Sequence, residues 1–250
     1  MTRDLLHGED APVITVNSEG RSPVVLLCEH AGRRIPARLG TLGLDDADLT
    51  RHIAWDIGAE AVSRLLADKL DAALVLQRYS RLVYDCNRPP ENPGAIPVLS
   101  ELTAIPGNQG LTAEAKLERM RAIYRPFHDA VSALLDERAA RGQRSVIITM
   151  HSFTPVFKGE RRAVEFGLLY HHDDRLARRL LPLFGDLDAR LNQPYAPQHG
   201  VCHTTDLHAE ARGLAYAMLE IRNDLIASQD GQIDWAKRLS VALGEIMADG

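Results

Sequence analysis

Two histidines and a glutamate stand where predicted strands end, and these residue types suit metal-assisted chemistry. The run PVVLLCEH ends at His30, SVIITMH ends at His151, and LAYAMLEIRND carries Glu220 near its end. Open α/β sheets place active sites beyond the carboxyl ends of their strands, so endings on neighbouring strands would meet at one edge. Two imidazoles and a carboxylate suit Zn²⁺ where thiolates are absent, and three protein ligands leave a fourth position for water. A hydrogen-bonded core histidine remains the alternative interpretation of His151.

These residues would be positioned by strands that alternate with helices. The predicted strands are 23–30, 71–77, 81–87, 145–151, 165–171 and 214–224, and the predicted helices are 49–70, 111–142, 173–183 and 234–250. The alternation predicts a three-layer α/β/α sandwich with a mixed central sheet. No linker separates two units, so we expect a single domain over 1–250. The Pro- and Gly-rich stretch 89–110 is a loop of a length that is usually functional or mobile.

The predicted helix 111–142 contains its own boundary signals. Thr112 is a suitable N-terminal cap and Gly142 a suitable end. Pro126 lies inside the helical pattern and is expected to kink the helix or to split it into two.

The composition argues against several classes of partner. A net charge of −5 gives no basic surface for nucleic acid, and the pair Arg161-Arg162 is interpreted as solvated. No apolar stretch approaches the roughly 18 residues that cross a bilayer, and the polar N-terminal segment lacks a signal-peptide core. Three cysteines, at 28, 86 and 202, show no CxxC spacing, which makes a disulfide framework unexpected. We therefore expect a cytoplasmic protein that binds a small molecule, with neither nucleic acid nor membrane as partner and with its oligomeric state open.

Six short stretches together resemble the N-formylglutamate amidohydrolase family. In chain order they are CEHAGRRIP, WDIGA, YSRLVYDCNRP, RPFHDA, MHSFTP and LEIRNDLI, and the resemblance runs from about residue 23 to 226. The family is related in fold to the zinc carboxypeptidases, so the resemblance implies a phosphorylase/hydrolase-like, zinc carboxypeptidase-like sandwich. It also implies a zinc-dependent hydrolase of a linear amide, with N-formyl-L-glutamate cleaved to formate and glutamate.

The resemblance assigns zinc ligands to His30, Asp56 and His151. In the carboxypeptidases a glutamate three positions beyond the first histidine also binds zinc, but Arg33 stands there in this chain. The family instead offers an aspartate at the start of the next helix, which is Asp56. Glu29 is the rival carboxylate, and strand alternation should aim it at the face opposite His30.

The resemblance makes Glu220 the general base, flanked by apolar residues that would keep water scarce. A base needs a carboxylate pKa balanced between burial, which raises it, and a nearby metal, which lowers it. Arg222 shares a strand face with Glu220 and would orient it catalytically; a plain ion pair between the two is the alternative.

The resemblance places the substrate carboxylate on Asn87 and Arg88, since a guanidinium grips a carboxylate through paired hydrogen bonds. Arg78 and Arg81 would bind a second carboxylate or polarise the scissile carbonyl. A structural pair between Arg81 and Asp85 is an equal alternative.

Other polar residues receive weaker interpretations. The segment containing His199, His203 and His208 is read as a substrate-covering loop rather than as a second metal site. His171-His172 could line the pocket, and His52 could support Asp56 on one helical face.

Three alternative functions stay open at this point. The first is another N-acyl amino acid hydrolase or small carboxypeptidase on the same scaffold, because the family's histidine-degradation members more often read Pro-His-Ser-Gly where this chain reads Glu-His-Ala-Gly. The second is a metal- or ligand-binding relative without turnover. The third is a hydrolase that uses Ser152 or Cys28, although no GxSxG surrounds Ser152. Zn²⁺ is the expected cofactor, with Co²⁺ and Mn²⁺ as other ions that such ligands accept.

Overall fold

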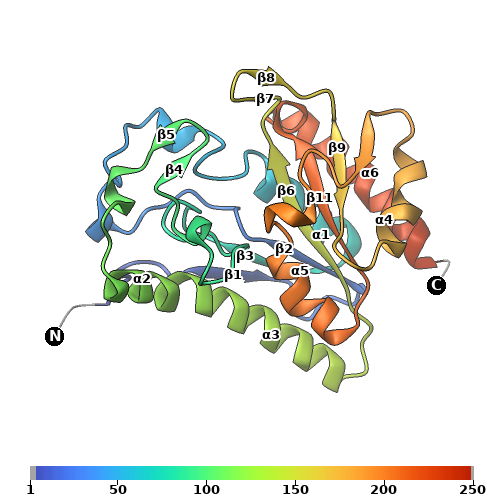
Figure 1. Ribbon diagram of the computed structural model, residues 1–250. Helices are drawn as coiled ribbons and strands as arrows, with labels where there is room; N and C mark the ends of the chain where they lie inside the picture. The colour runs from blue at the N-terminus through green and yellow to red at the C-terminus, as the bar shows by residue number, and fades with distance from the viewer. Residues whose placement is uncertain (1–3, 249–250) are drawn as a thin grey trace.

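The centre of the protein is a seven-stranded mixed sheet, seen in Figure 1 in a computed structural model that describes residues 4–248. In sheet order the strands are β1 (Val13–Val16), β3 (Ala73–Gln77), β2 (Val24–Cys28), β6 (Val146–Phe153), β11 (Tyr216–Arg222), β9 (Phe166–Leu169) and β10 (Ala189–Leu191). Strands β3, β2, β6 and β11 run parallel, whereas β1 is antiparallel to β3 and β9 to β11. The mixed sheet matches the prediction.

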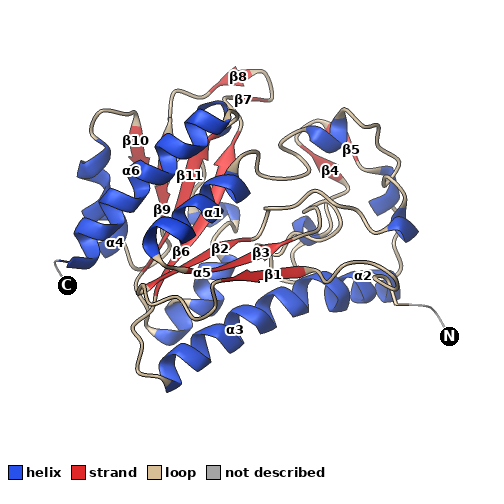
Figure 2. Ribbon diagram, turned by 180° about the vertical axis from the view of Figure 1, so that it is seen from behind, coloured by secondary structure: helices blue, strands red, loops and turns tan. Residues whose placement is uncertain are grey.

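Helices cover both faces of this sheet (Figure 2). One face carries α1 (Ala59–Leu70), α4 (Arg175–Leu180) and α6 (Gln229–Ala248), and the other carries α3 (Arg125–Ala140) and α5 (His203–His208). Alternation along β2 explains the two layers of core, because Leu26 and Cys28 pack into one cluster while Val25 and Leu27 pack into the other. The predicted α/β/α sandwich is therefore confirmed.

Two short hairpins lie at the carboxyl ends of the central strands. One pairs β4 (Leu99–Ser100) with β5 (Thr103–Ala104), inside the segment predicted as a long loop. The other pairs β7 (Val156–Phe157) with β8 (Glu160–Arg161). The backbone N–H of Lys158 donates to Glu101 Oε1 over 3.0 Å and joins the two hairpins.

The predicted helix 111–142 changes to a π-helical turn just before Pro126, with helical backbone on both sides. Thr112 caps α2 (Ala113–Arg119), its hydroxyl accepting from the Ala115 N–H at 3.2 Å. A π-helical turn, Met120–Tyr124, then leads into α3, where the Arg125 N–H donates to the Met120 carbonyl, and this wider turn accommodates Pro126 within continuous helical backbone.

One predicted helix was too long at its start, and one predicted strand was wrong. The helix predicted from 49 begins only at Ala59, because Gly58 adopts φ +81° and the Asp56 N–H donates to the His30 carbonyl at 2.9 Å instead of continuing a helix. A side chain at Gly58 would lie 2.3 Å from the Ile226 carbonyl oxygen. The predicted strand 81–87 is a series of turns, closed by bonds such as Val83 N–H to Ser80 O at 2.9 Å. The short edge strands β1 and β10 were not predicted.

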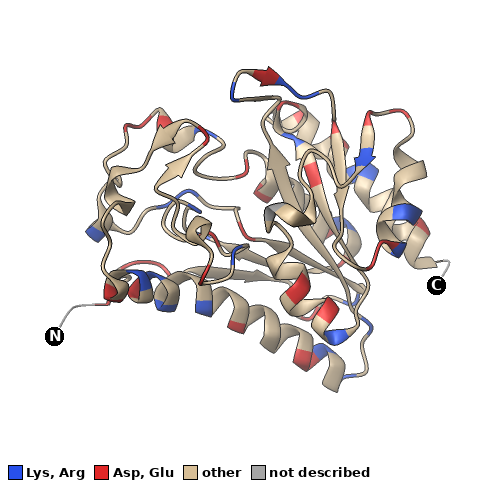
Figure 3. Cartoon of the chain, in the orientation of Figure 1, with Lys and Arg blue, Asp and Glu red and all other residues tan. Residues whose placement is uncertain are grey.

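The remaining global expectations concern membranes, charge and cysteines. None of the helices within residues 4–248 has the length and apolar character that crossing a bilayer requires. Basic and acidic residues are interspersed along the chain in Figure 3. All three cysteines are buried free thiols.

Candidate active site

A cavity of about 490 Å³ lies where β2, β6 and β11 end. Its lining combines the ends of these strands with residues from both hairpins. Seven of the nine predicted site residues line it, namely His30, Asp56, Arg81, Asn87, Arg88, His151 and Glu220.

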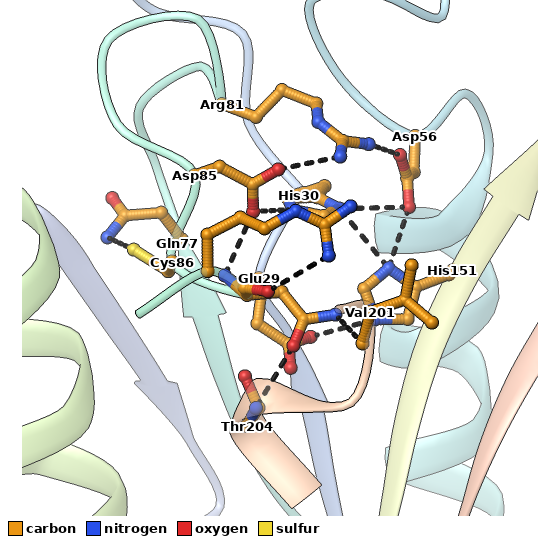
Figure 4. A network of polar contacts seen from close by, with 12 residues as sticks. Glu29, His30, Asp56, Gln77, Arg81, Asp85, Cys86, His151, Val201 and Thr204 are labelled. Carbon is orange, nitrogen blue, oxygen red and sulfur yellow. Dashed lines mark hydrogen bonds and ion pairs between the residues drawn. The ribbon is translucent and has the colours of Figure 1, made fainter. Parts of the chain in front are cut away.

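The three predicted metal ligands meet at one wall of this cavity, each of them buried (Figure 4). His30 follows β2, Asp56 precedes α1, and His151 lies within β6. Asp56 Oδ2 is 3.3 Å from His30 Nδ1 and 2.9 Å from His151 Nδ1, and the two Nδ1 atoms are 3.2 Å apart. Two nitrogens and one oxygen thus form a nearly equilateral triangle.

This triangle fits a tetrahedral divalent ion. Ligand atoms about 2.0–2.1 Å from zinc in tetrahedral geometry stand about 3.3 Å from one another. The three observed separations, 2.9, 3.2 and 3.3 Å, are close to that spacing. His30, Asp56 and His151 are therefore the residues that would hold a metal.

Each of the two histidines has a second carboxylate behind it. His30 Nε2 lies 2.7 Å from Asp85 Oδ1, and His151 Nε2 lies 3.2 Å from Glu29 Oε2. Metal-binding histidines usually place their other ring nitrogen against such an acceptor, which fixes the ring and its tautomer. Glu29, the rival carboxylate, is neither part of the triangle nor a cavity residue; it lies behind His151, one residue beyond the end of β2.

The electrostatics of this cluster favour bound positive charge. Burial acts to raise the pKa of Asp56, but the charge of His30 and hydrogen bonds from both histidines hold it below its ordinary value. Burial acts to lower the pKa of His151, yet the charge of Glu29 and a hydrogen bond to Asp56 raise it well above its ordinary value. Burial also opposes ionisation of Glu29, but His151 outweighs it and sets the Glu29 pKa at about 2. The surrounding carboxylates therefore favour positive charge at the triangle, carried either by a proton on an imidazole or by a bound cation.

Glu220 stands beside the triangle, paired with His151 in the parallel register of β11 and β6. Its side chain is buried, and its Oε2 atom has no hydrogen-bond partner within the described part of the chain. Burial raises the pKa of Glu220 to about 7, although the charge of His151 acts against that shift. A carboxylate with a free oxygen and a pKa near neutrality is suited to accept and return a proton.

Two predicted site residues lie elsewhere. Arg222 does not contact Glu220; its Nε donates to Asp224 Oδ1 at 2.8 Å, and Nη1 donates to the Ala163 carbonyl. Arg222 is the last residue of β11, and a 3-10 turn, Asn223–Leu225, follows it. Its guanidinium therefore lies beside this turn and Ala163 instead of beside Glu220. Arg78 directs its Nε to the Ala11 carbonyl at 2.9 Å, because the turn after β3 aims it at the N-terminal segment. Neither residue lines the cavity.

The predicted substrate-binding residues differ in whether their side chains already have partners in the protein. Arg81 already pairs with two carboxylates, with Nη2 2.7 Å from Asp85 Oδ2 and Nη1 3.3 Å from Asp56 Oδ1, so the structural pair is present. Asn87 holds the cavity wall, donating to the Val201 carbonyl at 2.6 Å and accepting from the Thr204 N–H at 3.0 Å.

Arg88, by contrast, forms no ion pair within residues 4–248. Its guanidinium donates to the carbonyls of Gly200 and Asn87. Its guanidinium lines the cavity and keeps donors free for an anion.

Arg162 is a cavity residue that the sequence analysis missed. Its guanidinium carbon lies 4.5 Å from the ring centroid of Phe157, 4.9 Å from that of Tyr195 and 5.7 Å from that of Phe153. Nη1 donates to the Tyr195 hydroxyl at 3.1 Å, and no ion pair to Arg162 exists in residues 4–248. The sequence alone predicted a solvated Arg161-Arg162 pair, but the β7–β8 hairpin and the aromatic rings around it place Arg162 at the cavity.

The other histidines lie outside the metal triangle. Nη2 of Arg51 and Nε2 of His52 both approach Glu101 Oε2, at 2.7 and 3.4 Å, so His52 does not support Asp56. His203 and His208 belong to α5 and form no ligand group with carboxylates; the side chain of His199 lies outside the described residues. His171 and His172 do not line the cavity.

Ser152 and Cys28 have structural surroundings. The Ser152 hydroxyl donates to the Ile57 carbonyl at 2.8 Å. Burial, together with the charges of Asp56 and Glu29, raises the pKa of Cys28 well above its ordinary value and disfavours a nucleophilic thiolate.

The fold is a three-layer α/β/α sandwich with three potential metal ligands at one wall of its cavity, and comparison with known proteins identifies the family. The sequence profile of the N-formylglutamate amidohydrolase family matches residues 22–227. The chain therefore belongs to that family, whose members are amidohydrolases. No curated protein matches it.

Two solved structures are similar to this chain. The crystal structure of gene product Atu2144 from Agrobacterium tumefaciens has 47% identity and a TM-score of 0.96, with 99% of each chain covered. The N-formylglutamate amidohydrolase from Ralstonia eutropha JMP134 has 20% identity and a TM-score of 0.65, with 95% of this chain and 97% of that chain covered. The second likeness supports the fold alone.

Proposed function

We propose that this protein is a metal-dependent amidohydrolase that hydrolyses N-formyl-L-glutamate to formate and L-glutamate. The observation that carries the proposal is the triangle of His30, Asp56 and His151 beside the unpartnered carboxylate of Glu220. Zinc, or another divalent ion in its place, would polarise the amide carbonyl and lower the pKa of a water molecule.

The protein's own residues supply the proton transfers. Glu220 Oε2 accepts a proton from the attacking water and returns it to the amide nitrogen as the C–N bond breaks. Asp85 and Glu29 hold the two imidazoles in place throughout. Arg81 balances the charge of Asp56 from the side opposite the histidines.

Two open guanidinium groups support a substrate with two carboxylates. Arg88 and Arg162 both line the cavity, and neither forms an ion pair within residues 4–248. In our proposal Arg88 binds the α-carboxylate of N-formyl-L-glutamate and Arg162 binds the γ-carboxylate, each through charge-assisted hydrogen bonds.

A second candidate substrate is an N-acyl amino acid with a larger acyl group. The rings of Phe153 and Phe157 and the side chain of Leu99 give the cavity an apolar wall that a formyl group would not fill. The two open cations match the charge of a glutamate moiety, and we favour the formyl compound because the chain belongs to the N-formylglutamate amidohydrolase family.

The test of catalysis is Glu220→Gln in the zinc-loaded enzyme. We expect formate release from N-formyl-L-glutamate to fall by about 10²–10⁴-fold, with zinc content unchanged. Glu137→Gln, an exposed glutamate on α3, is the matched control and should keep full rate. An unchanged rate in Glu220→Gln, or activity that survives removal of metal by a chelator, would overturn the proposal.

The test of the substrate compares N-formyl-L-glutamate with N-formyl-L-glutamine and N-acetyl-L-glutamate. Arg162→Met should reduce kcat/KM for the glutamate compound while leaving the glutamine compound unaffected. Faster turnover of longer N-acyl substrates would favour the second candidate.

We also propose a cytoplasmic location. The support is that Cys28, Cys86 and Cys202 are all unpaired thiols, as expected in a reducing compartment. Cell fractionation with an antibody against the protein tests this.

A further inference from the structure

A second group of histidines and carboxylates lies outside the active-site cavity. His171 and His172 follow β9, Asp206 lies on α5, and Glu210 opens the 3-10 turn after α5. One ligand atom from each of these four residues lies within 4.8 Å of the others. None of the four lines the cavity, so the proposed reaction does not use them.

The four side chains are arranged as two facing pairs. His171 Nδ1 is 3.0 Å from Asp206 Oδ1, and His172 Nδ1 is 2.6 Å from Glu210 Oε2. The two imidazole rings lie against each other with centroids 3.8 Å apart. Two imidazoles therefore face two carboxylates across one small space that is open to solvent on the His172 side, where 71% of that side chain is exposed.

Hydrogen bonds from neighbouring residues fix the Glu210 carboxylate. The Tyr216 hydroxyl and the His172 N–H, the latter at 2.8 Å, both donate to Oε1, which leaves Oε2 facing His172. The Tyr216 oxygen also accepts from the His171 N–H at 2.9 Å, so one buried tyrosine fixes both sides of the group. Burial acts to raise the pKa of Glu210, but these hydrogen bonds outweigh it and keep the pKa low. Ligating carboxylates in metal sites are commonly fixed by such outer hydrogen bonds.

We propose that His171, His172, Asp206 and Glu210 form a second divalent-metal site, selective for zinc-like ions. Two imidazoles favour Zn²⁺, Co²⁺ or Ni²⁺ over Mg²⁺ or Ca²⁺, which prefer oxygen ligands only. Four protein ligands are typical of a structural site, whereas the three at His30, Asp56 and His151 leave room for a reactant.

The second ion would fasten the chain after β9 to α5. The N-terminal end of α5 supports the active-site wall, because the Thr204 N–H donates to the cavity residue Asn87, which also binds the Val201 carbonyl. A cation at Asp206 and Glu210 would hold the opposite end of the same short helix. The site therefore braces the wall of the cavity without touching substrate.

The test is metal stoichiometry in protein stripped with a chelator and reloaded with Zn²⁺. The full chain should retain two equivalents after gel filtration, measured by elemental analysis. His171→Ala/His172→Ala should retain one. Asp174→Asn, on the same segment but paired with Arg178, is the matched control and should retain two.

A His151→Ala background separates this proposal from the proposed function. There the active-site ion is expected to be lost, while the second equivalent stays and Zn²⁺ still raises the Tm. Co²⁺ added to this background should give visible d–d absorption that disappears in the additional His171→Gln variant, the milder change if the double alanine variant unfolds. Equal metal content in the full chain and in the His171/His172 variants, or no Co²⁺ absorption in the His151→Ala background, would overturn the second site and leave the first untouched.

Discussion

Two pairs of buried histidines lie close to the Asp85–Asn87 turn, and they have opposite electrostatics. His30 and His151 have pKa values above the ordinary value for histidine, whereas burial lowers the pKa of His128 to about 4 and that of His208 to about 3. All four are less than 10% exposed, so burial alone does not separate them.

The difference lies in the partners of the rings. His128 Nδ1 lies 2.8 Å from His208 Nε2, and His128 Nε2 lies 2.9 Å from the Cys86 carbonyl oxygen. Among the residues that the structure describes, this pair has no carboxylate at hydrogen-bond distance. His30 and His151 share Asp56, and each has a further carboxylate behind it. The carboxylates, rather than the histidines, distinguish a site for a cation from a neutral hydrogen-bonded core pair.

The largest effect on this contrast is expected from Asp56→Asn, which removes the shared carboxylate. We expect the protein to lose its bound metal on gel filtration, and the metal-free protein to lose about 3–5 kcal/mol of unfolding free energy because buried charges lose their partner. Elemental analysis and urea denaturation measure the two effects. Asp136→Asn, an exposed partner of Arg212, should change stability by no more than about 1 kcal/mol. A variant that holds metal as tightly as the parent would contradict the assignment of Asp56.

A smaller effect is expected from Glu29→Gln, which makes the surroundings of His151 resemble those of His128. Loss of an outer carboxylate typically costs about 10–100-fold in metal affinity. Competition with a chromogenic chelator measures the change. Asp85→Asn should act similarly through His30, and unchanged affinity in both variants would show that the outer carboxylates do not tune the site.

A third effect concerns the neutral pair and the pH dependence of stability. An unfolded histidine binds a proton below a pKa of about 6.5, whereas folded His208 does so only near pH 3. Acidification from pH 6.5 towards 4 therefore favours the unfolded chain, by about 1.4 kcal/mol per pH unit for each such histidine. His208→Phe should reduce the pH dependence of the unfolding free energy by about 1.4 kcal/mol per pH unit. Urea denaturation of the metal-free protein at several pH values measures this dependence. Identical slopes in parent and variant would mean that His208 is not held neutral.

The sequence alone predicted the central strands β2, β6 and β11 and the residues near their ends. Strands β2 and β6 are buried along their whole length and β11 along nearly all of it, so hydrophobic pattern was a reliable guide to where His30, His151 and Glu220 would stand. Asp56 came from the resemblance rather than from periodicity, which wrongly placed it within a helix.

The parts that could not be predicted depend on long-range contacts. Asp85 was seen only as a partner of Arg81, since nothing local indicates that a turn brings it to His30, 55 residues away in the chain. Arg162 lies next to another arginine on a short hairpin, and only the packing of Phe153, Phe157 and Tyr195 around it turns it into the cavity. Arg222 was misjudged because it lies at the last position of its strand, where alternation ceases to fix direction.

The parallel pairing of Glu220 with His151 has a mechanical consequence. Both residues belong to neighbouring inner strands of the sheet, so the distance between their Cα atoms can change only if one strand slides along the other. A one-residue slip would turn the carboxylate to the other face, and a two-residue slip would displace it by about 6.6 Å. The sheet therefore fixes the positions of the reacting groups. Any adaptation to a differently shaped substrate falls to the two small hairpins around the opening, which can be rebuilt without disturbing the chemistry beneath them.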